Sequence, residues 1–151
     1  MRMELQPIFE EIDFVERYKR ICNEHNDLEN SMRGNNKKLY EEILSRIGFP
    51  YKYFSNGSFF KISEGNVNLH LVLKDGLIEP LLYIMKNGNS LLPRGRFDGI
   101  AEELQPGFRE QYTIPKYTSE QELEQILREI FSIYEEIKRE VLKAGESPRC
   151  S

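Results

Sequence analysis

Two arginines on either side of a glycine, Arg94-Gly95-Arg96, are the residues in this chain best suited to chemistry. Glycine lets the backbone approach a ligand closely, and a guanidinium donates two parallel hydrogen bonds to a carboxylate or phosphate. Arg94 and Arg96 therefore define one candidate, an anion-binding site in a small-ligand-binding domain or in an enzyme. The alternative is a solvated turn that leads into the next helix, and this is the interpretation that we favour.

Four glutamates follow one flank of the helix predicted near the C-terminus: Glu122, Glu129, Glu136 and Glu140. Local spacing gives them no counter-ion, and Glu136 faces Glu140, a like-charged pair that costs about a few tenths of a kcal/mol. A basic partner would explain this acidic ridge, because complementary charge speeds encounter and sets specificity. The alternative is a soluble helix face that needs no partner.

The other residue types with catalytic potential lack the required spacing. Neither His25 nor His70 has metal-ligand spacing around it, and His70 falls on the polar side of a predicted strand, as a plain surface histidine would. The sequence holds no Gly-x-Ser-x-Gly motif and no phosphate-binding loop. We therefore expect no catalytic residue, no metal and no cofactor, and a protein that is not an enzyme.

A nucleic-acid platform is a further interpretation, because aromatic residues on a sheet with nearby lysines can stack single-stranded bases. The chain, however, carries 21 Lys and Arg against 25 Asp and Glu, a net charge of −4. Aromatic residues at strand spacing also form core contacts. We therefore expect no direct nucleic-acid binding. The residues that would form the platform are Tyr51, Tyr53, Phe59 and Phe60 with Lys52 and Lys61.

A run of short strands joined by glycine turns forms the centre of the chain. Asn-Gly and Asp-Gly pairs favour tight hairpin turns, because such turns need positive φ angles. The turns Asn56-Gly57, Glu64-Gly65, Asp75-Gly76 and Asn87-Gly88 therefore predict an antiparallel meander of four to five strands within residues 50–93. Pro80 cannot donate to the sheet and predicts a bulge or an edge. The predicted strands are 51–54, 58–63, 66–73, 77–85 and 89–92.

Helices are predicted on both sides of this meander. Residues 1–48 fit one amphipathic helix from Pro7 to at least Glu24 and a second helix that Asn36 begins and Gly48 ends. Residues 94–118 form a long connection with a short helix over 99–105 capped by Asp98. A capping box at Ser119 begins the last helix, 119–144, and a tail follows at 145–151.

Length and composition place these elements in a single α+β domain, 1–151, with the terminal helices packed on one face of the sheet. No apolar run reaches the length of a membrane span, and the N-terminus lacks the pattern of a signal peptide. Cys22 and Cys150 lie far apart in the sequence. We therefore expect a cytoplasmic protein without membrane contact or a disulfide framework.

The order of these elements resembles the small immunity proteins of bacterial polymorphic-toxin and contact-dependent growth-inhibition systems. The stretch 95–104, GRFDGIAEEL, and the segment 115–120, PKYTSE, which leads into the last helix, carry the resemblance. It implies a non-enzymatic inhibitor that binds a cognate toxin domain, often a basic nuclease. It implies no particular residue.

These observations predict a toxin-neutralising immunity protein that binds a basic nuclease domain through Glu122, Glu129, Glu136 and Glu140. The alternative is a small-ligand or anion-binding domain, or an enzyme, that uses Arg94 and Arg96. A structural subunit of a larger assembly is a third interpretation, which an exposed apolar patch would favour. The oligomeric state and the identity of the toxin stay open.

Overall fold

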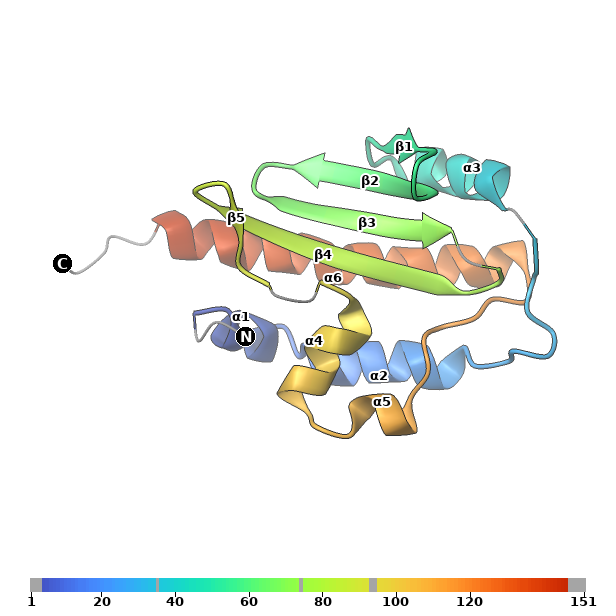
Figure 1. The fold of residues 1–151 in the computed structure, drawn as a ribbon, viewed down its shortest axis with the longest axis horizontal. Coiled ribbons are helices and arrows are strands. Elements are labelled where there is room, and N and C mark those ends of the chain that lie inside the picture. Colours follow the sequence, from blue (N-terminus) through green and yellow to red (C-terminus); the bar gives the residue numbers. More distant parts are fainter. Residues whose placement is uncertain (1–3, 35, 74, 93–94, 147–151) are drawn as a thin grey trace.

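The computed structural model describes residues 4–34, 36–73, 75–92 and 95–146, and its centre is a five-stranded antiparallel sheet. Each strand pairs with the next one in the sequence, so the order is β1-β2-β3-β4-β5 (Figure 1). The predicted α+β fold with its antiparallel meander is therefore confirmed. The strands are β1 Lys52–Phe54, β2 Phe59–Glu64, β3 Val67–Leu73, β4 Ile78–Lys86 and β5 Asn89–Ser90.

The turn between β4 and β5 shows why the glycine pairs predicted the meander. Asn87 and Gly88 have φ angles of 53° and 79°, and they connect the paired residues Lys86 and Asn89. Positive φ at both central positions matches the right-handed twist of the flanking strands.

Pro80 sits within β4 opposite Leu71, in a register that is continuous along β3 and β4, so of the two predicted possibilities, a bulge or an edge, there is no bulge. The missing backbone N–H of Pro80 would point to the outer edge of β4, which agrees with the predicted edge. On that edge Ile78 N donates to Pro115 O (2.9 Å) and Leu82 N donates to Gly95 O (2.7 Å). Backbone N–H groups two residues apart point the same way, so Pro80 lies between these two bonds, where no partner strand loses a hydrogen bond.

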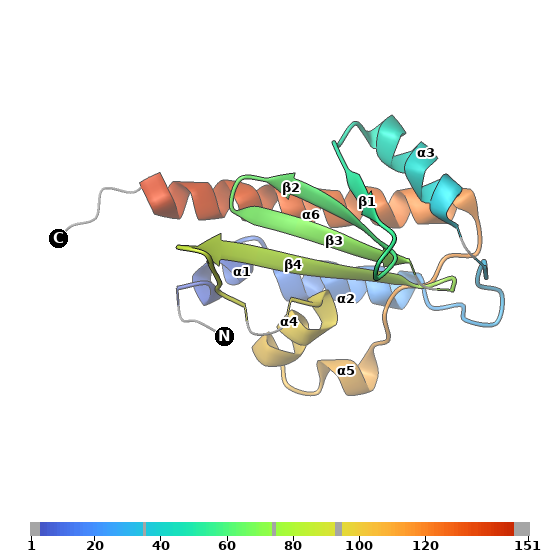
Figure 2. The ribbon, with the colours of Figure 1, turned by 45° about the horizontal axis from the view of Figure 1, so that its top comes forward.

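The helices gather behind the sheet and along its β4 edge (Figures 1 and 2). Alternate strand residues point toward them and are fully buried, among them Phe60, Leu69 and Leu82. Their neighbours along each strand point to the other face. The helices are α1 Gln6–Glu11, α2 Phe14–Glu24, α3 Lys37–Ile47, α4 Phe97–Leu104, α5 Phe108–Gln111 and α6 Glu120–Glu146.

The single N-terminal helix predicted from Pro7 is two helices, because the chain breaks at Asp13. Asp13 adopts the left-handed conformation, with φ 58° and ψ 45°, which aspartate tolerates better than most residues. The break lets α1 bury Phe9 and α2 bury Phe14, Tyr18 and Ile21 on differently directed faces. One straight helix would have to bury both sets of residues on one broad stripe.

The connection after the sheet folds back along the β4 edge as α4 and α5. Helix α4 begins at Phe97, with Arg96 at its N-cap position, so the prediction that Asp98 caps this helix is wrong. Gly95 is required here, because a Cβ at this position would overlap the carbonyl oxygen of Leu82. Helix α5 is a single turn that the sequence did not predict.

The start of α6 follows the predicted capping box in part. Ser119 Oγ accepts a hydrogen bond from Glu122 N (3.1 Å), as an N-cap serine does. The Glu122 carboxylate reaches back to Thr118 N (2.6 Å) and Thr118 Oγ1 (2.9 Å) instead of to the backbone of Ser119. The helix is therefore fixed at both sides of its first turn.

Candidate functional site

The glutamates predicted to form an acidic ridge lie along the seam between α6 and α2. The two helices run antiparallel, and α2 side chains reach α6 at two levels. Arg17 forms an ion pair with Glu136, and at the other end of the seam His25 Nδ1 lies 2.7 Å from Glu122 Oε2. Burial alone would raise the pKa of Glu122, but hydrogen bonds from His25 and Thr118 hold it below its usual value.

Within α6 itself, Glu140 pairs with Lys143 (3.3 Å). The prediction that the ridge lacks partners in its own chain is therefore wrong for Glu122, Glu136 and Glu140. Helical spacing could not reveal two of these contacts, because the partners come from a helix about a hundred residues away in the sequence. Among the residues that the structure describes, Glu129 is exposed and forms no ion pair or side-chain hydrogen bond.

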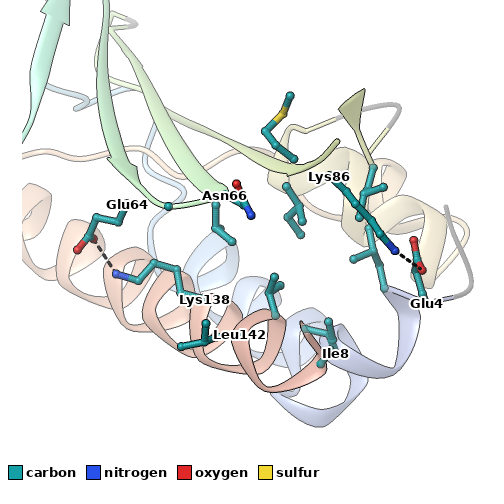
Figure 3. Close-up of a pocket in the computed structure, with 15 residues that line it drawn as sticks. Glu4, Ile8, Glu64, Asn66, Lys86, Lys138 and Leu142 are labelled. Atoms are coloured by element: carbon teal, nitrogen blue, oxygen red, sulfur yellow. Dashed lines mark ion pairs between the residues drawn. The ribbon is translucent and has the colours of Figure 1, made fainter. Parts of the chain in front are cut away.

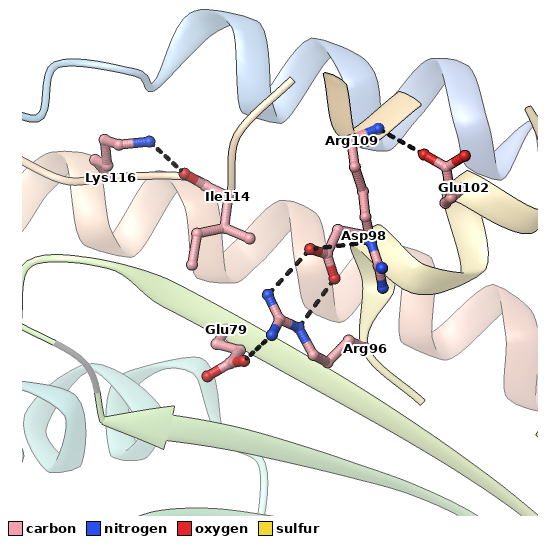
Figure 4. Close-up of polar contacts among 7 residues, drawn as sticks. All are labelled: Glu79, Arg96, Asp98, Glu102, Arg109, Ile114 and Lys116. Carbon is pink, nitrogen blue, oxygen red and sulfur yellow. Dashed lines mark hydrogen bonds and ion pairs between the residues drawn. The ribbon is translucent and has the colours of Figure 1, made fainter. Parts of the chain in front are cut away.

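Arg96 is held by two carboxylates, so it is not the unpaired anion donor that the alternative, anion-binding interpretation requires (Figure 4). Its Nε and one terminal nitrogen donate to the two oxygens of Asp98, each at 3.0 Å. Its other terminal nitrogen lies 3.0 Å from Glu79 Oε1. The second residue of the predicted site, Arg94, lies outside the described residues.

These contacts explain the arginine and the two carboxylates as a tie between α4 and the sheet. Glu79 and Asp98 expose only 8% and 9% of their surface, so leaving either one unpaired would cost several kcal/mol. Arg109 Nε of α5 adds a longer contact to Asp98 (3.7 Å). The cluster therefore positions α4 and α5 on the β4 edge.

The sheet face turned away from the helices is left uncovered by them (Figures 1 and 2). Figures 1 and 2 show all labelled helices behind this face or along its edge, and no described helix crosses it. Most of its side chains are partly or fully exposed, because they come from the strand positions that alternate with the core, whereas Glu79 is buried there. Val72 and Leu81 lie on it beside four aromatic rings.

The four rings form an aromatic ladder, with one ring from each of β1 to β4: Phe54, Phe59, His70 and Tyr83. The centroids of Phe54 and Phe59 are 5.0 Å apart with 12° between the ring planes, and those of Phe59 and His70 are 4.7 Å apart with 16°. Tyr83 follows at 4.4 Å from His70, tilted by 44°. Each ring is thus held by its neighbour, and the ladder is ordered before any partner binds.

Lysines accompany the ladder on the same face. Lys52 Nζ lies 5.2 Å from the centroid of the Phe54 ring, and Lys61 is the cross-strand partner of His70. Burial, together with the positive charge of Lys61, lowers the pKa of His70 to about 4. His70 is therefore neutral at physiological pH and behaves as a third flat ring, not as the plain surface histidine that was predicted.

The aromatic residues suggested for nucleic-acid stacking do not share one face. Phe60 is buried, and Tyr51 and Tyr53 pack against it at 5.5 Å and 4.9 Å on the helix side. Only Phe59 and the two lysines lie on the open face. Base stacking needs ring faces turned to the solvent. Most faces in the ladder are taken by neighbouring rings, so the ladder suits a protein surface better than a base.

The ladder is the feature that sequence reasoning missed, although the signal was present. The two-residue turn at Gly65-Asn66 fixes the register that places Lys61 opposite His70 and Phe59 opposite Val72. Following that register across the strands would have aligned the rings. The alternation of residues in β3 had already placed His70 on its polar side, away from the face predicted to pack against the helices.

Two further properties of the described residues bear on function. No group of three or more histidine, cysteine, aspartate or glutamate side chains among them is placed to hold a metal ion. Of the helices in the described ranges, none combines the length and apolar character needed to cross a membrane.

The comparisons with known proteins give no match. The chain matches no protein-family model, no curated protein and no solved structure. The function proposed below therefore depends on the geometry of this chain and on the resemblance described above.

Proposed function

We propose that this chain is a non-enzymatic immunity protein that binds and neutralises a toxin domain, and that the toxin docks on the aromatic ladder. The observation that carries the proposal is the ordered row of partly exposed rings on a face that the described helices leave open. Aromatic side chains are enriched at the centres of protein interfaces and dominate their binding energy.

The arrangement of the ladder favours tight binding. Immobilising a flexible side chain at an interface costs roughly 0.5–1.5 kcal/mol. Phe54, Phe59, His70 and Tyr83 are already fixed by mutual stacking on a sheet that the helices support from behind. A partner would therefore meet a rigid, largely apolar surface and lose little entropy there.

Charge on this face indicates what the toxin surface would carry. Lys52 and Lys61 border the ladder, and the nearest acid on the same face, Glu79, is bound to Arg96. A toxin surface that is apolar at its centre and acidic at its rim complements this pattern. It differs from the basic surface that the acidic ridge predicted.

A basic nuclease docking on the helical side is the second form of the same proposal. Glu129 supports it, because it is exposed and has no charged partner among the described residues. Glu136 does not support it, since it is already paired with Arg17. The two forms place the toxin on opposite sides of the molecule and can be separated by mutation.

The test measures affinity for the toxin domain encoded beside this chain, by isothermal titration calorimetry. Tyr83→Ala removes the last ring of the ladder, and we expect affinity to fall about thirtyfold or more, as at an aromatic interface hot spot. Tyr83→Phe keeps the ring and should bind within a fewfold of the wild type. Glu129→Lys should leave the affinity unchanged.

The opposite result for these two variants would place the toxin interface on the helical side. A loss with Glu129→Lys and none with Tyr83→Ala would transfer docking to the helical side. No binding of the wild-type chain to that toxin domain would overturn the proposed function. Urea unfolding of each variant confirms that a loss of affinity is not a loss of fold.

A further inference from the structure

A pocket of about 900 Å³ opens at the far end of the sheet from α3 (Figure 3). Helix α1 and the last turns of α6 form one side of it. The β2–β3 turn, the end of β4 and Leu91, which follows β5, form the other. This volume lies within the range of roughly 300–1,000 Å³ that is typical of small-molecule sites in proteins. Neither the acidic ridge nor the aromatic ladder contributes to it.

The walls of this pocket are aliphatic. Its apolar lining comes from α1, α6 and the strands, and Ile8, Met85, Val141 and Leu142 are the apolar side chains there that keep exposed surface. None of the fifteen described residues that line the pocket is aromatic. Aromatic walls would favour a ligand with flat rings. Aliphatic walls contact a flexible hydrocarbon chain at every point along the pocket. At the rim, Leu142 leaves 60% of its surface exposed, which extends the apolar area outward.

Two lysines stand at the mouth, and they differ in how firmly they are held. Lys138 Nζ lies 2.7 Å from Glu64 and 3.3 Å from Glu135, and only 19% of its side chain is exposed. Lys86 Nζ lies 3.9 Å from Glu4, and nearly half of each side chain is exposed. A surface ion pair at that distance contributes about 0–1 kcal/mol, so Lys86 can exchange Glu4 for another anion at little cost.

We propose that this pocket binds a linear aliphatic anion, with its chain among Ile8, Val141 and Leu142 and its carboxylate on Lys86. The ligand class follows from the two properties together. The apolar walls remove a hydrocarbon chain from water, and the one loosely paired cation at the mouth offers a charge-assisted hydrogen bond to its head group. This site does not depend on the function proposed for the sheet face.

The test titrates the full chain with decanoate and, separately, with the uncharged 1-decanol by isothermal titration calorimetry. We expect saturable binding of decanoate with one molecule per chain. Lys86→Gln should weaken decanoate about tenfold and leave decanol unchanged, because only the anion uses the ammonium group. Lys38→Gln, at an exposed lysine on α3, is the control and should change neither.

A second pair of variants tests the apolar part of the site. Leu142→Trp places a bulky ring at the rim and should reduce the affinity for both ligands by tenfold or more. Leu28→Trp is the matched control, since Leu28 is also a large exposed apolar residue, with 50% of its surface exposed, and lies outside the pocket. The toxin affinity of Leu142→Trp should equal that of the wild type.

Four results would overturn the proposal. The first three are the absence of saturable decanoate binding, an equal loss of decanol and decanoate with Lys86→Gln, and an equal effect of Leu28→Trp and Leu142→Trp. A dimer in sedimentation velocity that Leu142→Trp dissociates would overturn it too, because a second copy of the chain would then occupy the pocket.

Discussion

The seam between α2 and α6 and the open face of the sheet differ in what their side chains lack. In the seam, carboxylates that have no counter-ion within their own helix find one on the neighbouring helix, as Glu136 does with Arg17. On the open face, the aromatic rings stack on each other, and Lys52 lies over the outermost ring, Phe54. A group that looks unpaired in one element is therefore poor evidence for an external partner, whereas rings that remain partly exposed after the whole fold has formed are better evidence.

The largest expected change in stability distinguishes two neighbouring residues of β2, Phe60 on the buried face and Phe59 on the open face. Phe60→Ala empties a site in β2 that is fully buried against Tyr40 and Tyr53, and should lower the free energy of unfolding by roughly 3–5 kcal/mol. Phe59→Ala, one residue earlier on the open face, should cost about 1 kcal/mol. Urea unfolding measures both.

This pair decides whether the ladder serves the fold or a partner. If Phe59→Ala destabilised the chain as much as Phe60→Ala, the open face would be part of the core and its exposed rings would need no partner. If Phe59→Ala costs only about 1 kcal/mol, as expected, stability of the fold does not by itself account for the ordered row of rings.

A smaller effect should distinguish two glutamates of the seam. Glu136→Lys breaks the pair with Arg17 and sets two cations side by side, so we expect a loss of roughly 1–2 kcal/mol in the free energy of unfolding. Glu129→Lys has no charged partner to lose among the described residues and should stay within about 0.5 kcal/mol. Thermal or urea unfolding at low ionic strength measures the difference.

Equal values for the two variants would mean that the seam contacts contribute nothing in solution. The acidic ridge would then again be available to an outside partner. The same result would weaken the contrast with the open face, because the contact between Glu136 and Arg17 would then stabilise the fold no more than an exposed side chain does.

The sequence predicted the parts of this structure that depend on local geometry. The meander followed from turns such as Asn87-Gly88, and the end of α3 followed from Gly48, which adopts a φ of 94° at the C-cap. It failed where distant elements meet. The pairing of Arg17 with Glu136 depends on how two helices pack, and the engagement of Arg96 depends on where β4 places Glu79.

Stability should depend on pH through His70. Burial and Lys61 lower the pKa of this imidazole to about 4 in the folded chain, whereas an unfolded chain has the ordinary value near 6.5. As the pH falls from about 6.5 to about 4, the unfolded chain takes up a proton that the folded chain does not, so this contribution to stability is present above pH 6.5 and is lost through that window. Since the ring is partly exposed, solvent screening limits the loss to roughly 1 kcal/mol.

The variant His70→Phe isolates this contribution, because it keeps a ring in the ladder and cannot titrate. Urea unfolding at pH 7.5 and pH 5 should show a larger decrease for the wild type than for His70→Phe. Identical decreases would mean that His70 titrates at its ordinary pKa and that the centre of the ladder is open to water. The open face would then be less like a preformed apolar surface than its geometry indicates.

The smallest effect concerns the charge beside that ring. Lys61 lowers the pKa of His70 less than burial does, so Lys61→Gln should raise the pKa by less than half of its total depression. Lys52→Gln, at the Phe54 end of the ladder, is the matched control and should leave the pKa of His70 nearly unchanged, because charge effects through solvent weaken with distance. The chemical shift of the His70 ring as a function of pH measures both.

A full return of the His70 pKa to 6.5 with Lys61→Gln would show that the lysine, and not the packing of Phe59 and Tyr83, keeps His70 neutral. The ladder would then be held together by an exposed charge that salt can screen, and a partner could not rely on finding it preformed.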